Sequence, residues 1–204
     1  MKIVGFTDSH GSSSAISKVE KLAVKNKADM ILCCGDLTIF GREAEPALKT
    51  LSKIGIPILI IHGNHEEDSK LKKTCERYKN VFFIHKSSML IGNVLILGYG
   101  GGGFSHTDKN FVGISKLFKR SIDDKKKRMP NLKVVLMTHA PPYGTKLDDL
   151  MEDHCGNKDI ANFIREAKLD LALCGHIHEN EGREDKIGIT KVANPGPFGK
   201  LFII

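Results

Sequence analysis

Short apolar runs alternate with longer segments of helical periodicity along the first part of the chain. The runs at 2–7, 30–35 and 57–63 are separated by amphipathic segments at 14–27 and 42–55. Runs of this length and composition are typical of buried strands, and the intervening apolar spacing is that of helices with one buried face. A β-α-β-α-β order predicts a parallel sheet with helices packed on its faces.

Three further runs predict buried strands later in the chain, at 94–100, 133–140 and 169–175. The segments 185–194 and 200–204 are also strand-like but have no helix between them, which indicates antiparallel pairing. We therefore expect a mixed α/β fold. The chain has 204 residues, 41% of them hydrophobic, and no linker or repeat, so we expect one domain over residues 1–204.

Neither the N-terminus nor the cysteines indicate export. The apolar stretch before Asp8 is too short for a signal peptide, and no run approaches the length of a membrane span. The five cysteines lack CxxC spacing, which argues against a disulfide framework or a cysteine zinc site. We expect a cytoplasmic protein without membrane contact.

The formal charge of +7 favours anionic partners, nucleic acid among them. Much of the excess lies in helix-like segments at 18–27 and 116–128, where a solvated charged face is the ordinary explanation. No aromatic residues interleave with these lysines as a stacking platform would require. Nucleic acid therefore stays an alternative partner.

Polar side chains follow five of the predicted strands at the point where each strand ends. They are Asp8, Ser9 and His10, then Asp36, then Asn64, His65 and Glu66, then His139, and last His176 and His178. Five of the nine histidines of the chain lie at these positions. Functional groups of open α/β sheets collect at the carboxyl ends of strands, and these oxygen and imidazole donors suit manganese, iron or zinc.

The number of ligand-type side chains exceeds what one divalent ion takes when water and substrate must also bind. Two ions about 3.5–4 Å apart can hold a bridging hydroxide and clamp a phosphoryl group for in-line displacement. Asp36 is the candidate for a shared carboxylate because it follows a central strand.

The ordered set of motifs resembles the calcineurin-like metallophosphoesterase superfamily. The set is D-x-H at 8–10, G-D at 35–36, G-N-H-E at 63–66, a histidine at 139 and G-H-x-H at 175–178. The resemblance implies two mixed β-sheets packed as a sandwich and flanked by helices, in four layers. The small size is similar to that of the compact bacterial and archaeal members, many of which are phosphodiesterases.

The resemblance also implies a dinuclear site and a division of roles. The ligands would be Asp8, His10 and His178 for the first ion, Asn64, His139 and His176 for the second, and Asp36 between them. His65 would face the substrate and protonate the leaving oxygen, with Glu66 as a candidate to orient it. Manganese is the expected metal, with iron, zinc and nickel as alternatives.

Departures from the pattern bear on the substrate. The large phosphoprotein phosphatases of this superfamily carry an aspartate-arginine-glycine run after the G-D motif and an arginine before G-N-H-E. Here His62 stands at the second position, although Arg42 could still reach the site. The run at 194–199 resembles the N-P-G-S loop of the compact group with Pro197 in place of serine; Asn194 there is either functional or part of a turn.

The glycine run from Gly98 to Gly103 offers a rival interpretation as a dinucleotide fingerprint. Such a fingerprint requires a helix to begin at the glycines, whereas turn formers follow here, and Asp123 lies in a lysine-rich helical pattern. We expect the loop Tyr99–Asn110 to form a flexible lip over the site instead. His106 in it is either a substrate contact or an ordinary loop residue.

The sequence thus predicts a dinuclear metal-dependent phosphodiesterase that acts on a small phosphodiester through a metal-bridging hydroxide. One alternative is a nuclease of the same superfamily. The other is a non-catalytic metal-binding scaffold, although such members tend to have lost ligands and this chain has kept them. No pattern in the sequence indicates an oligomeric state.

Overall fold

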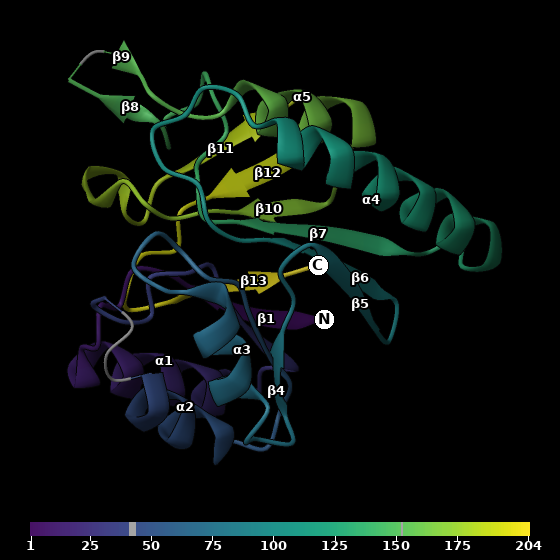
Figure 1. The fold of residues 1–204 in the computed structure, drawn as a ribbon. Coiled ribbons are helices and arrows are strands. Elements are labelled where there is room, and N and C mark those ends of the chain that lie inside the picture. The colour runs from purple at the N-terminus through teal and green to yellow at the C-terminus, as the bar shows by residue number, and fades with distance from the viewer. Residues whose placement is uncertain (41–43, 152) are drawn as a thin grey trace.

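The computed structural model describes residues 1–40, 44–151 and 153–204, and it contains two large β-sheets that pack face to face (Figure 1). The first sheet has the order β13 (Lys200–Ile203), β1 (Lys2–Phe6), β2 (Met30–Cys33), β3 (Ile58–Ile60) and β4 (Val81–Phe83). The second has the order β11 (Glu184–Ile187), β12 (Thr190–Ala193), β10 (Leu171–Leu173), β7 (Lys133–Thr138), β6 (Val94–Tyr99) and β5 (Ser87–Ile91). A short β-hairpin of β8 (Asp149–Leu150) and β9 (Asp153–His154) stands apart.

The strands of both sheets are parallel in the middle and antiparallel at edges. Strands β1 to β4 are parallel to one another, and so are β6, β7, β10 and β12. The late strands β11 and β13 pair antiparallel with β12 and β1, as the sequence predicts for the last third of the chain. Strand β5 pairs antiparallel with β6.

Helices cover the outer face of each sheet. In Figure 1, α1 (Ser13–Asn26), α2 (Ala44–Ser52) and α3 (Asp68–Cys75) lie on the first sheet. On the second lie α4 (Lys109–Arg128) and α5 (Lys158–Ala167). The side chains of each strand alternate between the layers: Ile3 joins the core between the sheets, and Val4 joins the core under α1. The predicted four-layer sandwich flanked by helices is confirmed.

Polar caps fix where the longer helices begin. The side chain of Ser12 accepts a hydrogen bond from Ala15 N at the start of α1, and Asp108 accepts from Asn110 N and Phe111 N at the start of α4. Such caps satisfy amide groups that have no partner within the helix. Among the described residues, no helix is both long and apolar enough to cross a membrane. All five cysteines are free thiols.

Candidate metal centre

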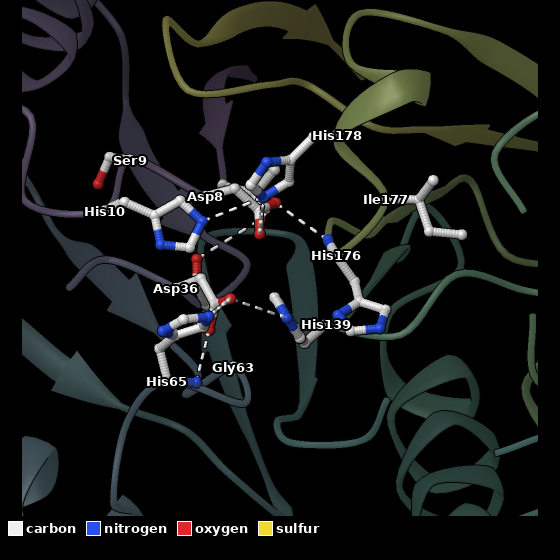
Figure 2. A network of polar contacts seen from close by, with 12 residues as sticks. Asp8, Ser9, His10, Asp36, Gly63, His65, His139, His176, Ile177 and His178 are labelled. Carbon is white, nitrogen blue, oxygen red and sulfur yellow. Dashed lines mark hydrogen bonds and ion pairs between the residues drawn. The ribbon is translucent and has the colours of Figure 1, made fainter. Parts of the chain in front are cut away.

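Five strands from both sheets end at the same edge of the sandwich. The register pairs Phe6 with Cys33 and Cys33 with Ile60, so β1, β2 and β3 end level with one another. Leu173 pairs with Met137 in the second sheet, which brings the ends of β10 and β7 together. The polar residues that follow these strands converge there (Figure 2).

Asp8, His10 and His178 form one group of potential ligands. The Nε2 atoms of His10 and His178 lie 3.0 Å apart, and His178 Nε2 lies 3.6 Å from Asp8 Oδ1. The other carboxylate oxygen, Asp8 Oδ2, accepts hydrogen bonds from Thr7 Oγ1 at 2.7 Å and from His176 N at 3.0 Å. These bonds aim Oδ1 at the two imidazoles.

Asp36 lies close to side chains from both sheets, His65 from the first and His139 from the second (Figure 2). Its Oδ1 accepts a hydrogen bond from His65 N at 2.9 Å. Its Oδ2 lies 3.5 Å from His139 Nε2 and 3.8 Å from His65 Nε2. Asp36 also belongs to one group with Asp8 and His139 and to another with His10 and His65. A carboxylate in this position can reach ions on either side of it.

Asn64, His139 and His176 form the other side of the site. Asn64 Oδ1 lies 2.9 Å from His139 Nε2 and 2.9 Å from His176 Nδ1. His139 Nδ1 donates to the carbonyl of Cys34 at 2.9 Å, so when the ring is neutral its lone pair lies on Nε2 and faces the site. The amide oxygen and the two imidazoles therefore point at one place.

The charges of the site shift one another's pKa values. Burial raises the pKa of Asp36, but the neighbouring His139 and His65 outweigh it, and the pKa lies below its ordinary value. Burial also raises the pKa of Asp8, but the hydrogen bond with His178 and the charge of His139 outweigh it, so this pKa too lies below its ordinary value. Burial, reinforced by the charge of His139, lowers the pKa of His176 to about 4. Two ionised carboxylates and a neutral imidazole are suitable forms for metal ligation.

Four site residues have left-handed backbones. The φ angles are 52° at Asp8, 47° at His10, 48° at Asp36 and 74° at His176. Residues other than glycine rarely adopt this region, and when they do so in a cluster the strain is commonly found at functional sites. The strained turns at these strand ends therefore also indicate a functional site.

The glycines of the three motifs allow the backbone to approach the carboxylates. A Cβ atom on Gly63 would overlap the side chain of Asp36, and one on Gly175 would overlap the side chains of Thr7 and Asp8. At Gly35 a Cβ would lie 2.6 Å from Gly63 N and 2.8 Å from His139 Nδ1. These motifs therefore require glycine for reasons of space.

Glu66 does not orient His65, contrary to the suggestion from the sequence. Its buried carboxylate accepts hydrogen bonds from Gly63 N at 2.8 Å and Asp36 N at 3.0 Å. It also accepts from Thr38 N at 2.8 Å and Thr38 Oγ1 at 2.9 Å. Glu66 thus ties the loop after β3 to the loop after β2, and so fixes the backbone of Asp36.

The donor set fits a pair of divalent ions. Asp8 Oδ1 is buried and has no hydrogen-bond partner among the described residues, and it belongs to the group with His10 and His178. Buried polar atoms are ordinarily partnered, so this carboxylate oxygen indicates a ligand. Carboxylate, amide and imidazole donors together suit first-row transition metals, while the choice among them depends on more than the donors.

The glycine run packs against His62 and forms no dinucleotide site. A Cβ on Gly100 or Gly101 would lie 2.7–2.8 Å from atoms of the His62 ring, which accounts for glycine at both positions. Helix α4 begins only at Lys109, and Asp123 lies within it. His62 belongs to a separate group with Asp68 and His85.

The loop between β6 and α4 reaches the site through Phe104, whose ring centroid lies 4.6 Å from that of His176. His106 instead places Nδ1 3.1 Å from the carbonyl of Gly156 and its ring against Tyr143, which favours an ordinary loop role. Arg42 lies outside the described residues.

Asn194 holds the loop that carries His176 and His178 in place. It is fully buried, its Nδ2 donates to the carbonyl of Ile177 at 3.2 Å, and its Oδ1 accepts from Gly196 N at 3.0 Å. The carbonyl of Gly196 in turn accepts from Thr7 N at 3.1 Å. Asn194 is thus more than a turn residue, because it links the β10 and β1 loops that carry the ligands.

Three comparisons with known proteins agree with this arrangement. The model of the calcineurin-like phosphoesterase family matches residues 1–180. An uncharacterized protein of Methanocaldococcus jannaschii, MJ1162, is 32% identical over 97% of this chain and 88% of its own length. A protein of Arcobacter nitrofigilis, named "Probable glycerophosphodiester phosphodiesterase GpdQ", is 28% identical over 84% of this chain and 65% of its own length.

Solved structures share the fold. The crystal structure of the protein TT1561 of Thermus thermophilus superposes with a TM-score of 0.73 at 18% sequence identity. The superposition covers 96% of this chain and 88% of that chain. The fold with its two large sheets therefore also occurs in another protein.

Proposed function

Because the chain belongs to the calcineurin-like phosphoesterase family, we propose that it is a phosphodiesterase that works with two divalent metal ions. The family comprises hydrolases of phosphoester bonds that use a dinuclear metal site. The observation that carries the proposal is the convergence of two carboxylates, one amide and four imidazoles at one edge of the sandwich.

The two groups of ligands divide naturally between two ions. We assign Asp8, His10 and His178 to one, Asn64, His139 and His176 to the other, and Asp36 to both. When bound, such a pair supplies a hydroxide nucleophile at neutral pH and neutralises the charge on the phosphoryl oxygens. Manganese is the metal we expect.

The chain's own residues provide orientation and a proton. His65 lies beside Asp36, with Nε2 3.8 Å from its Oδ2, and is the candidate to protonate the leaving oxygen. The nearby hydroxyls are engaged elsewhere: Ser9 Oγ donates to the carbonyl of Leu37 at 3.2 Å and Thr7 Oγ1 to Asp8 at 2.7 Å. This supports direct attack by water over a covalent intermediate on serine or threonine.

A diester is favoured over a monoester by the charge around the site. A monoester carries an extra negative charge that the large phosphatases neutralise with arginines, and His62 occupies one of those positions here. Burial lowers the pKa of His62, so it is a poor substitute for a permanent cation. The name of the 28% identical relative from Arcobacter nitrofigilis points the same way.

Hydrolysis of bis-p-nitrophenyl phosphate with added manganese tests the proposal, with EDTA as the control. In oxygen-18 water, a single turnover should leave the label in the phosphate product; label in a protein carboxylate would contradict direct attack. Binding of metal without hydrolysis of any ester would favour the scaffold alternative. Strongly salt-dependent cleavage of DNA or RNA, well above that of small diesters, would favour the nuclease.

The assignment of Asp36 has its own test in metal content. Asp36→Ala should lose both ions and nearly all activity, whereas Asp8→Ala should weaken chiefly one ion. Mass spectrometry of the metal-loaded proteins gives the number of ions per chain. An Asp36 variant that keeps both ions tightly bound would refute the shared-ligand role.

A further inference from the structure

Two large apolar side chains stand exposed next to the candidate metal centre. Phe40 is 78% exposed, and its ring centroid lies 4.9 Å from that of His65. Phe104 is 61% exposed, and its ring centroid lies 4.6 Å from that of His176. An exposed phenyl ring forgoes the stabilisation that burial gives, and both rings lie instead against histidines of the site.

The backbone of Phe40 adds a second cost. Its φ angle is 49°, in the left-handed region that bulky residues rarely adopt. The sequence has 20 glycines, many of them at positive φ, yet a phenylalanine occupies this position. A strained, exposed ring beside the candidate acid indicates a function for the ring itself.

The two rings lie against different residues of the site, Phe40 beside His65 and Phe104 beside His176. His65 contacts Asp36 at 3.8 Å, Asp36 contacts His139 at 3.5 Å, and the ring centroids of His139 and His176 are 5.1 Å apart. In Figure 2, His65 and His176 accordingly lie on either side of Asp36 and His139. A phosphodiester bound between His65 and His176 would have Phe40 on the side of one organic group and Phe104 on the side of the other.

We propose that Phe40 and Phe104 form an aromatic rim that stacks on the organic groups of the substrate, and that the substrate is a small phosphodiester carrying a flat ring such as a nucleobase. This inference rests on the proposed phosphodiesterase function. With His65 as the acid, the leaving group lies beside Phe40 and the retained group beside Phe104. Stacking of a base on an aromatic side chain changes affinity by about 5- to 150-fold.

The chemistry of the rim disfavours a polyol group. A glycerophosphodiester presents hydroxyl groups, which need hydrogen-bond partners when they lose water, and a phenyl ring supplies none. A nucleobase presents a π-face that any aromatic side chain can stack on. The rim thus distinguishes ring-bearing diesters from alkyl diesters.

Tryptophan reporters test the stacking without reference to catalysis. The chain has no tryptophan, so Phe40→Trp and Phe104→Trp each introduce a single fluorophore. Ile189→Trp is the control, because Ile189 is 75% exposed in the turn that precedes β12, at the end of that strand remote from the site. Manganese-loaded protein is titrated with thymidine 5′-monophosphate and with ribose 5-phosphate, which lacks a base.

We expect saturable quenching by the nucleotide in both rim variants, little quenching by the sugar phosphate, and neither in the control. Equal responses to the two ligands would overturn the aromatic rim. Quenching by the nucleotide that is as strong in Ile189→Trp as in the two rim variants would also overturn the aromatic rim.

Kinetics test the effect on selectivity with a constant leaving group. p-Nitrophenyl thymidine 5′-phosphate and ethyl p-nitrophenyl phosphate differ only in the retained group. Phe104→Ala should lower kcat/KM about 5- to 150-fold on the thymidine ester and less than about 2-fold on the ethyl ester, and Phe104→Tyr should retain the wild-type preference. Equal losses on both esters would overturn the inference. If the wild type cleaved neither ester, the phosphodiesterase function would fail, while the fluorescence titration would still decide the rim.

Discussion

At the scale of single residues, some side chains of the candidate site are placed to bind metal and others hold the loops in position. Asp36 and Asn64 offer side-chain oxygens to the ligand cluster, whereas the carboxylate of Glu66 accepts hydrogen bonds from Gly63, Asp36 and Thr38 in neighbouring loops. Adjacent residues of one motif can therefore have unrelated roles. The distinction matters for His65, which lies close enough to Asp36 to be either an acid or a ligand.

His65→Gln should keep both ions and lose kcat. General acid catalysis is typically worth about 10²- to 10⁴-fold, and it matters when the leaving group needs a proton. The loss should therefore be large for an alkyl or ribose leaving group and small for p-nitrophenolate, with metal content unchanged by mass spectrometry. Loss of metal, or equal loss on both kinds of ester, would show that His65 is not the general acid.

Glu66→Gln should weaken metal binding through Asp36. The amide nitrogen replaces one carboxylate oxygen, so it faces either the donors Gly63 N and Asp36 N or the donor Thr38 N, and such a mismatch costs about 1–3 kcal/mol of unfolding free energy. We expect a higher manganese concentration for half-maximal activity, with kcat largely restored at saturating metal. Glu67→Gln is the matched control because its carboxylate is exposed. Loss of stability with an unchanged manganese requirement would limit Glu66 to a structural role.

At the scale of elements, glycines at the strand ends decide how closely the loops approach the carboxylates. Gly175 is the clearest case. A Cβ there would overlap the side chains of both Thr7 and Asp8, and its φ angle is not positive, so lack of space and not backbone conformation accounts for the glycine. By contrast, a Cβ on Gly113 in α4 would meet nothing within 4 Å. The same substitution should therefore have opposite effects at the two positions.

Gly175→Ala should displace Asp8 and lower activity by about 100-fold or more, since a shift of about 1 Å in a reacting group has this effect. Gly113→Ala should keep activity and raise the free energy of unfolding by about 0.5–1 kcal/mol, because glycine disfavours a helix interior. Chemical denaturation and diester hydrolysis measure the two effects. An active Gly175→Ala with normal metal content would refute the close-approach argument.

The sequence predicts a helix or strand well where its apolar residues form a clear run or periodic pattern. It predicts poorly the features that depend on contacts between residues far apart in the chain. Strand β2 is buried on both faces and forms one apolar run, whereas α3 buries only Leu71 and Cys75, too few for a clear helical pattern. Strand β5 is mostly exposed and depends on pairing with β6. The role of Glu66 could not be predicted either, because the chain separates it from Asp36 by 30 residues.

At the scale of the whole molecule, the candidate ligands come from both sheets. Those after β1, β2 and β3 belong to the first sheet, and those after β7 and β10 to the second. Apolar contacts hold the two sheets together elsewhere, with Ile3, Met30 and Leu59 of one sheet packed in the same core as Val135 and Leu171 of the other. At the ligand edge, buried carboxylates and imidazoles replace this packing. Ions that bind both sets would therefore connect the sheets where apolar contacts do not.

Removal of metal should consequently lower the thermal stability of the whole protein. An ion present at 100 times its dissociation constant stabilises the folded state by about 2.7 kcal/mol when the unfolded chain does not bind it. For a chain of this size each kcal/mol raises Tm by about 2–4 °C, so each ion should contribute about 5–10 °C. Calorimetry with and without EDTA measures the difference, and Asp36→Ala should abolish most of it. Metal binding that leaves Tm unchanged would contradict this prediction, because it requires the unfolded chain to bind the ions as tightly as the folded protein does.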